Sequence, residues 1–295
     1  MNTLHRGSIV VGVDEVSLAG QAVRWAGEQA ALEGRRILLV RAESPVTTGW
    51  STHAMDVPLG TFTSQRRHGE ELLGRAHDHV HAVAPDVEVE QLFDVTDPRT
   101  LILRSAEGAH LVALGSRGRG PLLSHLLGSV GVGVARRARC PVVVHRPSHP
   151  GRVHAGVVVA VDATEDAIPV LEFGFHQASL RGLPLRVVHY VMDPRSALVG
   201  VPMVGDLSAQ LEEDELAVSE AMAGMRERYP DVRATVRSTP GLAEHDVATA
   251  ATRADLLVVG THQRPAADRL LVGSVSTAVL EHATCPVAVV PVRSS

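Results

Sequence analysis

The strongest constraint on the fold is an internal duplication, because it requires one arrangement of elements to occur twice. Three stretches of the first half return in the second half in the same order. They are "IVVGVDEVSLAG" from Ile9 and "VVVAVDATEDAI" from Val157, "AHLVALGSRGRG" from Ala109 and "ADLLVVGTHQRP" from Ala254, and "GSVGVGVARRARCPVVV" from Gly128 and "GSVSTAVLEHATCPVAV" from Gly273. A segment rich in proline and basic residues, 145–154, separates the copies. We therefore expect domains at residues 1–147 and 156–295, joined by a linker at 148–155.

Each copy alternates short runs of Val, Ile and Leu with stretches of helical periodicity. In the first copy, the predicted strands are residues 9–14, 36–42, 87–93, 110–115 and 141–145. These runs lack a clean alternation of apolar and polar residues, which indicates strands buried on both faces of a parallel sheet. The predicted fold class is therefore α/β, with two tandem doubly wound parallel sheets. Ligands of such sheets bind beyond the carboxyl ends of the strands.

The composition argues against several classes of function. No run approaches the ~18 apolar residues of a membrane span, so we expect a soluble, cytoplasmic protein without a membrane partner. The formal net charge of -5 argues against a nucleic-acid partner. All 28 basic residues are arginine. The absence of lysine excludes a phosphate-binding P-loop with its lysine and any lysine Schiff base.

The loop "GSRGRGPLLSHLLGS", residues 115–129, is the main candidate for a ligand-binding site. Gly115 and Gly118 follow a predicted strand, where absent side chains let backbone N–H groups approach a ligand. Gly128 and Ser129 precede a predicted helix, whose N-terminus carries unpaired N–H groups and partial positive charge. Such a loop suits a phosphate chain. The alternative is an ordinary glycine-rich turn in which the serine caps the helix.

Two arginines of this loop, Arg117 and Arg119, can add positive charge at its rim. Elsewhere the titratable pairs have simpler interpretations. Cys140 and Cys285 precede predicted buried strands, and we expect inert core thiols. His77 and His81 share a helical face, but without a third ligand in spacing a solvated helix end is favoured over a metal site.

The loop and its surroundings resemble the nucleotide-binding signature of the universal stress protein family. Glycine, two residues, glycine, nine residues and Gly-Ser occur in that order, together with "VVGVD" near the start and "RCPVVV" at the end of the copy. The resemblance covers both copies, as in tandem members of the family. It implies a five-stranded, Rossmann-like sheet of order 3-2-1-4-5 in each copy, adenine-nucleotide binding, and a role in stress response or growth arrest.

The resemblance also implies which residues bind the nucleotide, with ATP as the expected ligand, with or without Mg²⁺. In the first copy they are Asp14, Ala42, Gly115, Arg117, Gly118, Arg119, Gly128, Ser129 and the backbone of Val130. Ala42 would read the adenine edge through its backbone. Asp14 would accept from nucleotide hydroxyl or amino groups or hold the Mg²⁺ ion. Its alternative role is to stabilise the N-terminus of the first helix. No catalytic or metal-ligating residues are assigned.

The second copy keeps part of this pattern. The retained residues are Asp162, Gly260, Gly273 and Ser274. Gln263 stands at the second glycine's position, and Pro265 stands opposite Gly120. If that position requires φ > 0, glutamine costs on the order of 1 kcal/mol there. In the first copy, Glu15 and Val16 replace the Gly-Ser that usually follows the aspartate. Whether the second copy binds nucleotide is left open.

Three functions remain. We favour a regulatory ATP-binding protein that is not an enzyme. The alternatives are a slow ATP hydrolase, for which we find no general base or nucleophile motif, and a nucleotide-free scaffold. The last predicted strand of each copy lies at a sheet edge. The resemblance implies that these edges pair in an intramolecular pseudo-dimer, and it leaves a homodimer of whole chains open.

Overall fold

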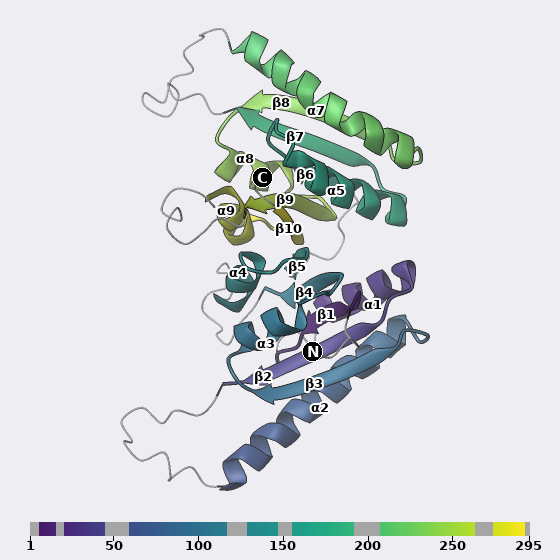
Figure 1. Ribbon diagram of the computed structural model, residues 1–295, viewed down its shortest axis with the longest axis vertical. Coiled ribbons are helices and arrows are strands. Elements are labelled where there is room, and N and C mark those ends of the chain that lie inside the picture. Colours follow the sequence, from purple (N-terminus) through teal and green to yellow (C-terminus); the bar gives the residue numbers. More distant parts are fainter. Residues whose placement is uncertain are drawn as a thin grey trace, which may run out of the picture. The chain divides into compact units, whose positions relative to one another are not determined.

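The computed structural model describes residues 6–15, 21–44, 59–116, 129–146, 155–191, 207–262 and 274–292. The chain divides into two compact units, residues 1–145 and 146–295. Each unit holds one of the two sequence copies, and each is an α/β layer structure (Figure 1). The α/β class and the tandem arrangement predicted from the sequence are therefore confirmed.

The first unit is a parallel sheet of order β3-β2-β1-β4-β5. Its strands are β1 (Ile9–Gly12), β2 (Ile37–Glu43), β3 (Val89–Val95), β4 (Leu111–Gly115) and β5 (Val142–His145). This confirms the predicted strands, whose ends shift by one or two residues, and the predicted order 3-2-1-4-5. Ile9 of β1 lies beside Ile37 of β2 and Leu111 of β4. The carboxyl ends of these three strands therefore meet at one edge of the sheet.

Helices cover both faces of this sheet, as a doubly wound fold requires (Figure 1). They are α1 (Gln21–Glu33), α2 (Leu59–Val83), α3 (Pro98–Ser105) and α4 (Ser129–Ala135). Helices α1 and α2 pack together against one face, and α3 and α4 pack together on the other. Asp97 caps α3, because its Oδ1 atom accepts from the backbone N–H of Thr100 at 2.9 Å.

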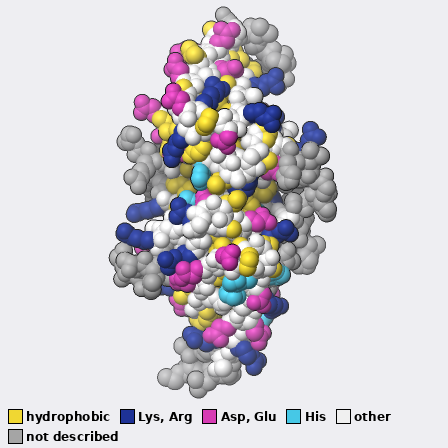
Figure 2. Space-filling view, turned by 90° about the vertical axis from the view of Figure 1, so that its right-hand side faces the viewer, with side chains coloured by type: hydrophobic (Ala, Val, Ile, Leu, Met, Phe, Trp, Pro, Cys, Tyr) yellow, Lys and Arg dark blue, Asp and Glu magenta, His cyan; other side chains and the backbone are white. Residues whose placement is uncertain are grey.

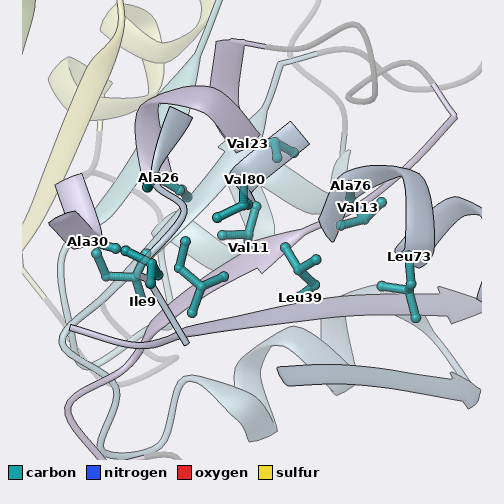
Figure 3. Close-up of a cluster of buried hydrophobic side chains, with 14 of the residues drawn as sticks. Ile9, Val11, Val13, Val23, Ala26, Ala30, Leu39, Leu73, Ala76 and Val80 are labelled. Atoms are coloured by element: carbon teal, nitrogen blue, oxygen red, sulfur yellow. The ribbon is translucent and has the colours of Figure 1, made fainter. Parts of the chain in front are cut away.

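Successive residues along β1 point alternately to the two faces of the first unit's sheet. Ile9, Val11 and Val13 point into one cluster with apolar residues of α1, α2 and β2 (Figure 3). The intervening Gly12 faces α3, since a Cβ atom added there would lie 3.3 Å from Cδ1 of Ile102. Both faces of β1 are thus buried, which explains why this strand shows no polar alternation in the sequence.

The second unit repeats this topology with the order β10-β9-β6-β7-β8. Its strands are β6 (Val157–Ala160), β7 (Leu185–Val191), β8 (Ala234–Pro240), β9 (Leu256–His262) and β10 (Val287–Val292). Its helices are α5 (Ala167–Arg181), α7 (Ser208–Arg228), α8 (Ala243–Ala250) and α9 (Ser274–His282). Val157 of β6 lies beside Leu185 and Leu256, as Ile9 lies beside Ile37 and Leu111. Positions in the two copies can therefore be matched residue by residue.

The described surface carries charges of both signs, and the two cysteines lie in the interior. On the face shown in Figure 2, arginines and acidic side chains are interspersed among the described residues. In the described ranges, no helix is long and apolar enough to cross a bilayer. Cys140 and Cys285 are both buried, as predicted for core thiols. Burial raises the pKa of the Cys140 thiol to about 11, which keeps it protonated near neutral pH.

Candidate functional site

The carboxyl edge of the first sheet carries the sequence-predicted residues that the structure describes. Asp14 follows β1 and is half-buried, Ala42 lies in β2, and Gly115 ends β4. Ser129 and Val130 open α4, the helix that follows β4. Since β1 lies between β2 and β4, the residues that end these strands are neighbours, and the helix N-terminus faces the same edge.

The remaining predicted residues belong to the two loops that lead into α4 and α9, and they lie outside the described residues. They are Arg117, Gly118, Arg119, Gly128 and Gly273, together with the departures Gln263 and Pro265. Their roles stay predictions.

A buried ion pair supports the edge of the first sheet. The guanidinium of Arg41 is paired with the carboxylate of Glu43, and their side chains are 4% and 10% exposed. Arg41 Nη1 also donates to the carbonyl oxygen of Val13 at 3.3 Å. Val13 immediately precedes Asp14, so this contact holds the backbone that presents the motif aspartate. Neither Arg41 nor Glu43 belongs to the motif predicted from the sequence.

The second unit contains a cavity of about 300 Å³ at the carboxyl edge of its sheet. This volume lies at the lower end of the range for small-molecule sites, roughly 300–1,000 Å³. Asp162 and Gly260, two of the predicted binding residues, are part of its lining. Its apolar walls include Val170, Val188, Val247, Val259 and Val292, and Tyr190 and Ser276 also line it. The cavity thus lies in the copy whose sequence motif departs from the family pattern.

Gly260 keeps two walls of this cavity apart. A Cβ atom added at Gly260 would lie 3.1 Å from Cγ2 of Val170 and 3.2 Å from Cγ2 of Val292. Both distances are shorter than ordinary van der Waals contact, so a larger side chain would crowd the end of β9. The space beside Gly260 is therefore tight for a Cβ atom, which Val170 and Val292 could admit only by shifting by a few tenths of an ångström.

Polar groups are few and lie at defined places in this apolar cavity. Asp162 is the second residue after β6. Its Oδ1 atom accepts a hydrogen bond from the hydroxyl of Thr164 at 2.7 Å. Thr261 of β9 and Ser276 of α9 add hydroxyl groups, and both residues are buried. Such an arrangement, with apolar walls and a few oriented polar groups, is typical of sites that bind an organic ligand.

His189 supports the second edge in the way that Arg41 supports the first. Its Nδ1 atom lies 2.9 Å from the carbonyl oxygen of Val161, the residue directly before Asp162. Its Nε2 atom lies 3.4 Å from Oδ2 of Asp214 on α7. Each copy therefore places a basic side chain from its second strand against the same backbone oxygen, and each basic side chain has a carboxylate beside it.

Comparison with known proteins agrees with this architecture. The sequence model of the universal stress protein family matches residues 5–146 and 156–291, and so it covers both copies. The chain belongs to the universal stress protein family. A universal stress protein of Mycobacterium tuberculosis is 35% identical over 292 residues, which cover 95% of this chain and 96% of the relative. Another from Mycolicibacterium smegmatis is 31% identical over 296 residues and 97% of both chains.

Among solved structures, a universal stress protein from Archaeoglobus fulgidus is similar with a TM-score of 0.68 and 19% sequence identity. The alignment covers 96% of this chain and 98% of that one. At this level of identity the likeness supports the fold alone. It agrees with the predicted Rossmann-like sheet of the universal stress proteins.

Two kinds of site residue in this universal stress protein carry no motif that marks them in the sequence. Arg41 lies in a run that is predicted to be a buried strand, and His189 holds the matching place in the second copy. Tyr190 of β7 and Ser276 of α9 line the cavity. The direction in which these two elements point the side chains is not visible in the sequence. Alignment of the two copies carries a signal for the first pair, since a basic residue at the same place in both second strands is unusual for a buried position.

Proposed function

We propose that both copies of this universal stress protein bind an adenine nucleotide at the carboxyl edge of their sheets. ATP is the proposed ligand, and the bound nucleotide has a regulatory role in stress response or growth arrest. The observation that carries the proposal is the cavity of about 300 Å³ in the second unit, which Asp162 and Gly260 line together. The family resemblance implies nucleotide binding for both residues, and the cavity lies where doubly wound sheets bind ligands.

The proposed nucleotide-binding residues are those of the family motif in each copy. In the first copy they are Asp14, Ala42, Gly115, Arg117, Gly118, Arg119, Gly128, Ser129 and Val130. In the second copy they are Asp162, Gly260, Gly273 and Ser274. Helices α4 and α9 begin at Ser129 and Ser274, which supports the expectation that the Gly-Ser pair leads into a helix. Their N-terminal N–H groups would then be available to phosphate oxygens.

A Mg²⁺ ion accompanies the nucleotide in this proposal. Asp162 and Asp166 both line the second cavity. Two carboxylates near a phosphate chain repel it, and a divalent cation offsets that repulsion. Carboxylate and hydroxyl oxygens are hard donors of the kind that Mg²⁺ prefers. Asp162 is the proposed ligand of the ion in the second copy, and Asp14 is its counterpart in the first.

Assembly and location stay predictions. β5 and β10 are each the last strand of their unit's sheet, and their pairing in a pseudo-dimer is expected from the family. A homodimer of whole chains is left open, and the cytoplasmic location is an expectation from the composition.

The test is calorimetric titration of the full chain with ATP, in MgCl₂ and in EDTA. We expect two equivalents of ATP for the wild type and about one each for Asp14→Asn and Asp162→Asn, with weaker binding in EDTA. Asp78→Asn is the matched control, because Asp78 is an exposed aspartate on α2. Absence of ATP binding, or wild-type binding in both site variants, would contradict the proposal.

A further inference from the structure

Tyr190 holds the position in the second copy that Ala42 holds in the first. Ile37 of β2 and Leu185 of β7 lie beside the first residues of β1 and β6, so the two strands share one register. Ala42 is five residues after Ile37 (42 − 37 = 5), and Tyr190 is five residues after Leu185 (190 − 185 = 5). One copy thus has a methyl group, and the other a phenol ring, at the end of the strand next to the motif aspartate.

The ring of Tyr190 is held in place by α8 and by the turn between β8 and α8. Its hydroxyl donates to the carbonyl oxygen of Asp246 at 3.3 Å. A Cβ atom added at Gly241 would lie 3.1 Å from Cδ1 of Tyr190, so the ring edge lies against this glycine. Asp246 also stabilises this turn, because its Oδ2 atom accepts a hydrogen bond from the N–H of Leu242 at 2.8 Å.

The held ring forms part of the cavity wall. Tyr190 lines the cavity together with Val188, Val247 and Val259. Burial raises the pKa of the phenol, and Asp246 adds to the shift. The hydroxyl therefore remains a donor to the Asp246 carbonyl near neutral pH. A fixed aromatic face with aliphatic side chains around it favours a flat heteroaromatic ligand, because stacking contacts form with little loss of side-chain freedom.

We propose that Tyr190 is a specificity-determining residue of the second site, where its ring stacks on the base of a purine nucleoside or nucleotide. This inference rests on the proposed function and deepens it. The two sites are then not equivalent. The second holds its ligand to a large extent through the base, and the first has no aromatic side chain at the corresponding position.

The probe is 2-aminopurine riboside, a fluorescent isomer of adenosine whose emission falls when its base stacks. The full chain is titrated as wild type, Tyr190→Phe and Tyr190→Leu, with ribose 5-phosphate as a ligand that lacks a base. We expect Tyr190→Phe to keep affinity and quenching, because it keeps the aromatic face. Tyr190→Leu fills similar space without that face, and we expect it to weaken binding of the riboside at one site about tenfold. Affinity for ribose 5-phosphate stays unchanged.

The reciprocal variant is Ala42→Tyr, which places the ring in the first copy and adds a second quenched class of bound riboside. If Tyr190→Leu does not fold, Ala42→Tyr decides: a new quenched class supports the inference, and no change contradicts it. If a folded Tyr190→Leu chain binds ATP and keeps wild-type affinity and quenching for the riboside, only the role of Tyr190 is overturned. Absence of both ATP and riboside binding in the wild type overturns the proposed function as well.

Discussion

His189 occupies in the second copy the position that Arg41 occupies in the first, and each contacts the carbonyl oxygen of the residue before the motif aspartate. The partners differ between the copies. Arg41 is paired with Glu43 on its own strand, whereas His189 lies beside Asp214 on a packed helix. The backbone that presents Asp14 and the backbone that presents Asp162 are thus supported by the same type of contact from different side chains.

Loss of Arg41 should strongly destabilise the first unit. In Arg41→Met the carboxylate of Glu43 stays buried without its cation, and the Val13 carbonyl loses a donor. We expect the free energy of unfolding to fall by about 3–5 kcal/mol, measured by urea denaturation. The double variant Arg41→Met/Glu43→Gln should recover a large part of this loss, because no buried charge then remains unpaired.

The matched control is Arg24→Ala. Arg24 forms an exposed i,i+4 pair with Glu28, at 2.9 Å and with 70% of the Arg24 side chain exposed. Exposed pairs of this kind contribute about 0–1 kcal/mol. Equal losses in Arg41→Met and Arg24→Ala would show that the buried pair has no special role.

Loss of His189 should affect the second copy alone. His189→Ala removes the donor to the Val161 carbonyl, and we expect a loss of about 1–3 kcal/mol in the free energy of unfolding. Binding of ATP to one of the two sites should weaken with it, since Asp162 follows Val161. Calorimetric titration checks this, and an unchanged two-site isotherm would show that the contact does not position the aspartate.

Gly260→Ala should narrow the second cavity. The added methyl group would lie 3.1 Å from Val170 and 3.2 Å from Val292, so the side chains at the cavity must shift. We expect a loss of about 1–3 kcal/mol in stability and loss of one nucleotide equivalent. Gly224→Ala on α7 is the control, because a Cβ atom there meets nothing within 4 Å. In the helix interior it should stabilise the chain by about 0.5–1 kcal/mol. A stable Gly260→Ala chain with two equivalents of nucleotide would refute this packing argument.

Cys140 should make the stability depend on pH above 9. Burial raises its pKa from 9.0 in the reference state to about 11 in the fold. The unfolded chain therefore loses this proton first, and the stability contributed by the protonated thiol is present below pH 9 and lost as the pH rises toward 11. The deficit of Cys140→Ala relative to wild type should shrink by about 2 kcal/mol between pH 8 and pH 10.5. Urea denaturation at both pH values measures it, and a constant deficit would contradict a raised pKa.

Much of the fold followed from the sequence, because the duplicated pattern of apolar runs constrains both sheets. The strand order came from the family resemblance, and the pairing of β1 with β2 and β4 confirms it. The candidate site was predictable where a motif marks it, as at Asp162 and Gly260, which line one cavity. The roles of His189 and Tyr190 were not predictable. Neighbouring residues of a strand face opposite sides of the sheet, so each of these two side chains meets a different layer of helices. Their roles depend on α7 and α8, whose packing no local pattern specifies.

The most direct measurement is the number of adenine nucleotides carried by each chain. Freshly purified protein is denatured, the released small molecules are separated by chromatography, and nucleotide is counted against protein, with Asp14→Asn, Asp162→Asn and Gly118→Ala beside the wild type. The account predicts up to two equivalents in the wild type, after incubation with ATP and Mg²⁺ if necessary, and about one in each variant. A wild-type chain that carries no adenine nucleotide and takes up none would contradict it.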